Sequence, residues 1–194
     1  MKRKTRIQIE HEQQLLELVQ DREISKRIRF LLANKNLGTQ ILLKEGGYTY
    51  RPNCHGTTIY VLGCKPPLKT KTYSRVLPQV ESLRGPGYLD NSVMEFFLEN
   101  VCTEVSTPEI SPFPRIVSFW SDVRGNIELQ HTLVYEGRYN GQGSELVFHQ
   151  PDTGRVFEVS SLEKAFSSYE RMLEREQPDF IRLVKRFHRL KDHN

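Results

Sequence analysis

The stretch from Ile116 to Ser161, IVSFWSDVRGNIELQHTLVYEGRYNGQGSELVFHQPDTGRVFEVSS, decides the fold class of this chain. Its runs IVSFWSDV, IELQHTLVYEG, SELVFHQ and GRVFEVSS are rich in β-branched and aromatic residues, which favour strands. The intervening segments RGN, RYNGQG and PDTG carry glycine and favour turns. The stretch therefore predicts a consecutive antiparallel meander.

Helical periodicity precedes this meander. From about Glu10 to Ala33, apolar residues recur at helical spacing between charges, which predicts one or two amphipathic helices ending near NKNLG. The segment 39–52 then predicts a short strand or turn, interrupted by two glycines. A further helix is expected to begin at Cys54, because Pro52 and Asn53 favour turns and helix starts.

Residues 91–105 predict another helix, after an irregular connection over 65–86. Asn91 or Ser92 is its expected N-cap. Its expected apolar face consists of Val93, Phe96, Phe97 and Val101. Cys102, near its end, is most simply a small buried apolar residue.

The chain returns to helix after the meander. Ser160 followed by Glu163 fits a capping box, which predicts a helix N-terminus there. The run DFIRLVKRFHRL, residues 179–190, predicts a last, basic amphipathic helix. For the helices before Gly38 and after Ser168, core packing is the favoured role, although covering a cleft or binding a partner stays open.

Length and composition are typical of one globular domain: 194 residues, 37% apolar and 27% charged. We expect a single α+β domain over 1–194, with a helical region at 1–47 and a basic C-terminal helix at 170–194.

The net charge of +4 comes from basic clusters at the two ends of the chain. Such runs are usually solvated faces, and no motif here would place them in a nucleic-acid groove, so nucleic-acid binding is not expected. Three cysteines are too few for a disulfide framework and indicate a reducing compartment. With no signal peptide or membrane-spanning run, we expect a cytoplasmic protein, or one delivered without a cleavable signal.

The residues best suited to chemistry are Cys54, His131 and His149. A helix N-terminus favours the thiolate of Cys54, and a nucleophilic thiol needs a base oriented by a third polar group. His131 is expected to open the strand HTLVYEG and so to face a cleft, and His149 lies near the end of the next strand. If these strands form a hairpin, the two imidazoles lie close together.

This arrangement resembles the NlpC/P60 superfamily of papain-like cysteine hydrolases. The matching motifs are NCHG at 53–56, HTLVYEG at 131–137 and LVFHQ at 146–150. The resemblance covers roughly 48–169 and implies a catalytic core there, with an insertion at 65–111. In that core, a nucleophile helix would pack on a meander sheet of about four to five strands. It implies no cofactor and no metal.

The resemblance also implies roles for individual residues. Cys54 would be the nucleophile, His131 the general base and then acid, and His149 the orienting group. The backbone N–H of Cys54 would stabilise an oxyanion, with Asn53, His55 and Gln150 as neighbours of the site. Asn53 and His55 stand where the family has Asp and Ser, and His55 stays unassigned.

Several functions are compatible with these residues. The first is a cysteine hydrolase that cleaves an amide, peptide or thioester bond in a peptide, protein or small amide substrate. The second is an acyltransferase or protein deamidase on the same fold. The third is a non-catalytic protein that binds a partner through its basic terminal helices. Metal binding ranks last, because Cys54, His55 and Cys64 lack the paired spacing of zinc ligands. Nothing in the sequence specifies an oligomeric state.

A thiol-reactive probe separates the enzymatic from the non-enzymatic alternatives. The enzymatic ones predict preferential labelling of Cys54 over Cys64 and Cys102 at neutral pH. From the sequence alone, this preference is expected to disappear when His131 is changed to Ala.

Overall fold

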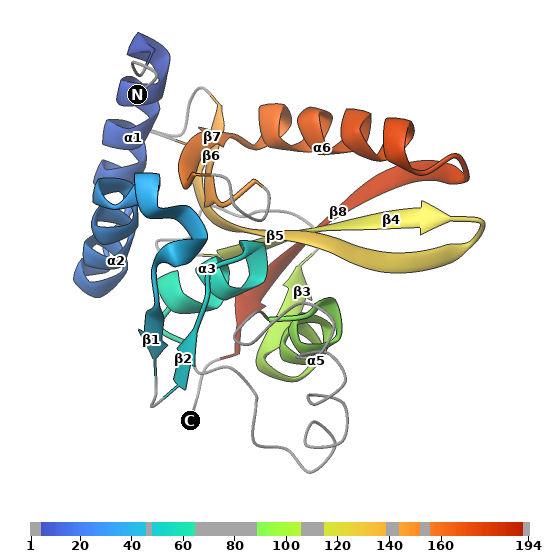
Figure 1. Cartoon of the computed structure of the whole chain (residues 1–194), viewed down its shortest axis with the longest axis horizontal. Helices are drawn as coiled ribbons and strands as arrows, with labels where there is room; N and C mark the ends of the chain where they lie inside the picture. Colours follow the sequence, from blue (N-terminus) through green and yellow to red (C-terminus); the bar gives the residue numbers. More distant parts are fainter. Residues whose placement is uncertain are drawn as a thin grey trace.

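A six-stranded antiparallel sheet forms the centre of the molecule (Figure 1). The structure, a computed structural model, describes residues 5–45, 48–64, 89–105, 115–138, 144–151 and 156–191. In hydrogen-bonding order, the strands are β3 (Cys102–Val105), β8 (Phe180–Leu190), β4 (Arg115–Val123), β5 (Asn126–Arg138), β6 (Glu145–His149) and β7 (Glu158–Ser161). A two-stranded sheet, β1 (Leu43–Glu45) with β2 (Tyr48–Tyr50), lies apart from it.

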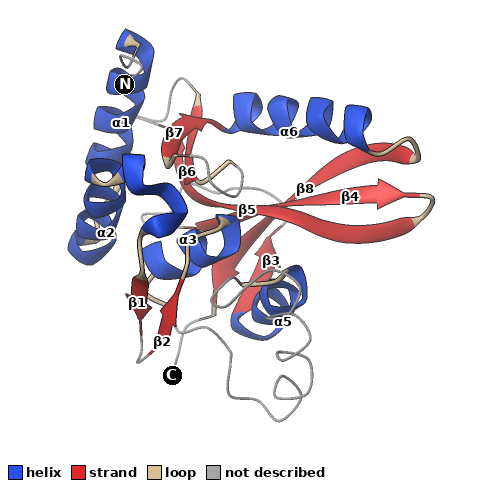
Figure 2. Ribbon diagram, viewed as in Figure 1, coloured by secondary structure: helices blue, strands red, loops and turns tan. Residues whose placement is uncertain are grey.

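Helices cover both faces of the six-stranded sheet, which makes the fold α+β (Figure 2). The α-helices of the described residues are α1 (Arg6–Leu18), α2 (Arg22–Ala33), α3 (Cys54–Val61), α5 (Asn91–Val101) and α6 (Leu162–Glu176). The first four share a core with one sheet face, whereas α6 packs on the other. Alternation along the strands creates these two cores, since Val134 points to the first and Leu133 to the second.

The predicted meander is confirmed, because β4, β5, β6 and β7 are consecutive neighbours in the sheet. The turn between β4 and β5 contains Arg124 and Gly125, whose φ angles are 52° and 85°. Positive φ at both positions is the geometry of a tight turn that matches strand twist. The other two predicted turns lie largely outside the described residues.

The C-terminal segment corrects one prediction. Residues 180–190 form strand β8 instead of a helix, and the sheet has six strands where about four to five were expected. Leu183 and Phe187 are four residues apart, as on a helix face, but both also lie on one face of a strand. Residues 180–190 form a strand because they pair with β4 on one side and with β3 on the other.

The predicted helix over 91–105 is also shorter than expected. It ends at Val101, and Cys102 begins β3, which pairs with β8. The N-cap is Asp90, whose side chain accepts a hydrogen bond from the Ser92 N–H, so neither Asn91 nor Ser92 has that role. The buried residues of α5 are Val93, Met94, Phe97 and Leu98, so Phe96 and Val101 lie at the margin of its packed face. Cys102 is buried, as predicted.

The N-terminal helices contribute to the core. Two helices form, with Thr5 capping α1 in a capping box and Asp21 capping α2. Leu15, Ile28 and Leu31 are fully buried. This packing supports the favoured structural role for the region. The predicted connection over 65–86 lies outside the described residues.

The N-cap of α6 lies one residue later than predicted. Ser161 accepts a hydrogen bond from the Lys164 N–H, whereas Ser160 is buried in the last part of β7. Among the described residues, no helix is both long and apolar enough to cross a membrane.

Candidate functional site

Asn53 determines where α3 begins. Its Oδ1 accepts a hydrogen bond from the Gly56 N–H at 2.7 Å, and its Nδ2 donates to the carbonyl of Leu89 at 2.6 Å. The first bond caps the helix and the second ties its start to the segment before α5. Cys54 is therefore the first residue of α3, as predicted, and its side chain is half-buried.

His131 approaches Cys54 from the middle of β5, not from the start of a strand as expected. The hairpin with β4 extends β5 back to Asn126. The register pairs Phe119 with His131 but Trp120 with Leu129, so Gln130 is the extra residue of a β-bulge. Because a bulge reverses the alternation of side chains, Leu129 and His131 point to opposite faces.

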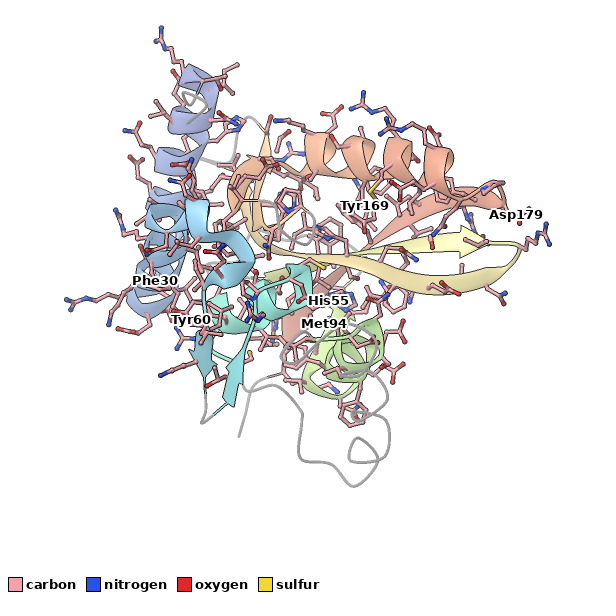
Figure 3. All side chains as sticks on the ribbon, in the orientation of Figure 1. Phe30, His55, Tyr60, Met94, Tyr169 and Asp179 are labelled. Atoms are coloured by element: carbon pink, nitrogen blue, oxygen red, sulfur yellow. The ribbon has the colours of Figure 1, made fainter. Side chains whose placement is uncertain are left out.

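The His131 ring is held by neighbours on α6 and β6. It stacks on Tyr169, with ring centroids 4.9 Å apart and planes inclined by 26°. The Tyr169 hydroxyl donates to the Gln130 carbonyl at 3.2 Å, which anchors the tyrosine at the bulge. In Figure 3, Tyr169 lies between α6 and the sheet. His131 Nε2 lies 3.1 Å from His149 Nδ1, so the ring nitrogen left for the thiol is Nδ1.

His149 is the last residue of β6, as predicted, and it is buried. Its Nε2 lies 3.3 Å from Ser160 Oγ and 3.6 Å from Glu158 Oε1, both on β7. Burial lowers the pKa of His149, although Glu158 opposes this shift. A neutral His149 with its proton on Nε2 satisfies all of these contacts: Nδ1 accepts from His131 and Nε2 donates to β7.

Cys54 is in a strongly activating environment. Burial alone would raise its pKa, but His55 and His131 act on it by charge and by hydrogen bonding. Together they hold the pKa of the Cys54 thiol well below its ordinary value. A thiolate paired with imidazolium is the form that attacks electrophilic carbon.

His55 is buried beside the nucleophile, at 1% exposure. Its Nε2 lies 2.9 Å from Asn91 Oδ1 and its Nδ1 lies 3.0 Å from Thr132 Oγ1. Burial would lower the pKa of His55, but the neighbouring thiolate and Asn91 raise it. His55, to which the sequence assigned no role, is thus held in place beside Cys54 by two hydrogen bonds.

Gln150 is fully buried and contacts α3 from the end of β6. Its Oε1 accepts a hydrogen bond from Thr57 Oγ1 at 3.5 Å. This contact lies one helical turn beyond Cys54, so it holds the helix against the sheet.

The sequence did not assign Asn91, Thr132, Glu158, Ser160 or Tyr169 to the site, although Asn91 and Ser160 were expected as helix caps. Four of these are polar residues whose importance depends on which residue the fold places beside them. Tyr169 marks the end of the motif resemblance but carried no assigned role. A weak signal existed for Thr132, because it follows His131 directly in the strand.

A groove of about 820 Å³ borders the His149 end of this site. His149 and Glu158 contribute to it, and α6 lines one wall with Lys164, Arg171 and Arg175. Cys54 is not part of its lining. The groove therefore gives access to the outer end of the histidine pair.

The other cysteines differ from Cys54. Burial raises the pKa of the Cys102 thiol to about 12, so it is protonated at neutral pH. Cys64 is half-buried after the end of α3. Within the described residues, no group of three His, Cys, Asp or Glu side chains is placed to hold a metal ion.

No family model, curated protein or solved structure matches this chain. The evidence for the function of this chain is therefore the geometry around Cys54.

Proposed function

We propose that this chain is a papain-like cysteine hydrolase that cleaves an amide or peptide bond through a Cys54–His131–His149 triad, as the resemblance to the NlpC/P60 superfamily implies. One observation carries the proposal. Cys54 begins a helix, His131 lowers the pKa of its thiol by charge and by hydrogen bonding, and His131 Nε2 lies 3.1 Å from His149 Nδ1. This arrangement suits a nucleophile, a base and an orienting group.

Acylation begins with attack of the Cys54 thiolate on the substrate carbonyl carbon. The carbon–oxygen π electrons move to oxygen, and the backbone N–H at the start of α3 stabilises the resulting oxyanion. When the tetrahedral intermediate collapses, the carbon–nitrogen bond breaks and His131 Nδ1–H protonates the departing amine. A thioester on Cys54 and a neutral His131 remain.

Deacylation uses the same groups in reverse. His131 Nδ1 accepts a proton from water, whose oxygen attacks the thioester carbon. Collapse of the second tetrahedral intermediate breaks the carbon–sulfur bond, which releases a carboxylic acid and restores the thiolate. His149 keeps His131 Nδ1 directed at the reacting atoms through both steps.

An acyltransferase and a deamidase would form the same thioester and differ in the acceptor or in the amide chosen. A binding role through basic terminal helices has less support, because residues 180–190 form a strand. Within β8, Lys185 lies over the Phe166 ring and Arg186 over the Trp120 ring. These basic side chains already pack on the protein itself.

The proposal is tested with an activated ester, p-nitrophenyl acetate, which needs no knowledge of the natural substrate. The wild-type chain should release a rapid burst of nitrophenolate equal to the amount of protein, followed by slower turnover. Cys54→Ser should abolish the burst, and Cys102→Ala should retain it. A wild-type chain that releases nitrophenolate without a burst, at the rate of Cys54→Ser, would contradict the proposal.

A further inference from the structure

His55 is an ionisable group that the triad does not use. It follows Cys54 in the first turn of α3, and its ring lies beside α3 in Figure 3. Burial of an imidazole beside a nucleophilic sulfur has an energetic cost unless the ring is satisfied by partners. The identity of those partners indicates what His55 does.

The Asn91 side chain determines the proton on one ring nitrogen. Its Nδ2 donates to the carbonyl of Leu129 at 2.6 Å, which fixes the orientation of the amide. Its Oδ1 therefore faces His55 Nε2 at 2.9 Å, and an amide oxygen only accepts. His55 Nε2 must carry a proton.

The second ring nitrogen has a partner that suits both protonation states. Thr132 Oγ1, 3.0 Å from His55 Nδ1, can accept from a protonated nitrogen or donate to an unprotonated one. Asn91 and Thr132 are both neutral, so neither balances a positive charge on the ring. The anion that most favours a positive charge on the ring is the thiolate of Cys54.

Other ionisable groups face this pair from the surrounding elements. His131 on β5 acts on Cys54, and His149 on β6 also interacts with the sulfur. Asp90, the N-cap of α5, favours the charged ring, and Glu95 of α5 interacts with it as well. The ring nitrogens themselves are engaged by Asn91 and Thr132, not by these carboxylates.

We propose that His55 is a second imidazolium that holds Cys54 as a thiolate independently of the proton on His131, with Asn91 and Thr132 positioning its ring. This inference rests on the proposed function and assigns the two histidines different tasks. His131 gives up its proton to the leaving group and recovers one from water. His55 keeps its proton, so the sulfur remains a good nucleophile and a good leaving group while His131 changes state.

Because the two histidines have different tasks, we expect His131→Ala to affect thiol labelling less than the sequence alone predicts. In His131→Ala, the thiol retains one imidazolium partner and should still react with iodoacetamide below neutral pH. In His131→Ala/His55→Gln it has none, and its reactivity should follow that of an ordinary cysteine. A change of one unit in thiol pKa alters the thiolate fraction about tenfold on the acidic side.

The test is therefore the pH dependence of iodoacetamide alkylation at Cys54, measured by peptide mass spectrometry. We expect His55→Gln to lower the rate at pH 6 about tenfold or more and to move the midpoint upward. His188→Gln is the matched control, because His188 is also buried but bonds Ser118 at 2.7 Å, away from the thiol. It should leave the midpoint unchanged. An unchanged midpoint in folded His55→Gln would overturn the inference.

A second measurement needs no variant. In the wild-type chain, NMR should show His55 protonated at pH 7, and carboxamidomethylation of Cys54 should lower the pKa of that ring by removing its anionic partner. A ring that is neutral at pH 7 beside the free thiol, or that does not respond to alkylation, would overturn the inference. Neither measurement uses a substrate, so a missing ester burst with intact thiolate pairing would reject the hydrolase proposal alone.

Discussion

His131 Nε2 and His149 Nδ1 lie 3.1 Å apart, which places two buried imidazoles within hydrogen-bond distance. His149 Nε2 donates its proton toward Ser160 and Glu158, so His149 Nδ1 is an acceptor. His131 Nε2 is therefore the donor, and His131 Nδ1 is left for the sulfur. In the proposed mechanism, the pair can act as base and orienting group only while His149 stays neutral.

Changing His149 tests this orienting role. We expect His149→Ala to lower the rate of Cys54 acylation, because His131 loses the acceptor for its Nε2–H. Positioned acid–base catalysis is worth about 10²–10⁴-fold, and loss of orientation should forfeit about tenfold or more of it. His149→Asn offers an amide oxygen as a substitute acceptor and should recover part of the rate. Equal burst rates for wild type and His149→Ala would remove His149 from the site.

Tyr169 should affect catalysis through its ring. The stacked ring, at 4.9 Å between centroids, limits rotation of His131. Because a displacement of about 1 Å can cost up to about 10²-fold in rate, we expect Tyr169→Ala to slow acylation about tenfold or more. Tyr169→Phe keeps the ring and should remain within about threefold of wild type in the burst rate. If both variants lose activity equally, the hydroxyl bond to Gln130 matters more than the stacking.

Asn53 should contribute to stability through the start of α3. Asn53→Ala removes the cap on Gly56 and the donor for the Leu89 carbonyl. We expect a loss of about 1–2 kcal/mol in the free energy of unfolding, measured by urea denaturation. Asn53→Ser restores a capping oxygen and should recover part of that loss. Indistinguishable midpoints for Asn53→Ala and wild type would show that the cap is not limiting.

Glu136 on β5 predicts an unusual pH dependence of stability. Burial raises the pKa of this carboxyl from 4.5 to about 8, Asp21 adds to the shift, and its Oε1 has no hydrogen-bond partner among the described residues. Between those pH values the unfolded chain releases a proton that the folded chain keeps, so stability falls as pH rises. For one group the slope is at most about 1.4 kcal/mol per pH unit.

Glu136→Gln removes the ionisable carboxyl that causes this pH dependence. Its stability relative to wild type should therefore increase from pH 5 to pH 8, as measured by urea denaturation at several pH values. Parallel curves for the two proteins would show that the native carboxyl titrates normally.

The parts of the fold that sequence predicted are those with strong local signals. Alternating residues and glycine turns identified β4 to β7, and Asn53 with Cys54 identified the start of α3. Strand β8 was missed because the apolar spacing of Leu183 and Phe187 suits a helix as well as a strand. Its pairing with β3 and β4 brings together segments far apart in sequence, which no local pattern records.

The candidate site also has residues that the sequence predicted and residues that it could not predict. Cys54, His131 and His149 stand in recognisable local motifs, and the structure brings them together. Asn91 was expected as a helix cap, but its amide bonds Leu129 and His55 instead. The position of His131 inside β5 depends on the bulge at Gln130, which only the register with β4 defines.

In the proposed mechanism Cys54 carries the acyl group and His131 activates the water that releases it. The most direct test of this mechanism is peptide mass spectrometry of the chain quenched during the p-nitrophenyl acetate burst. We predict one acetyl group per chain, located on Cys54, and at least about 10²-fold slower loss of that group in His131→Ala, because the water that releases it needs a base. Acetylation spread over Cys64, Cys102 and surface lysines, or an acetyl group lost from Cys54 equally fast in His131→Ala, would contradict the proposal.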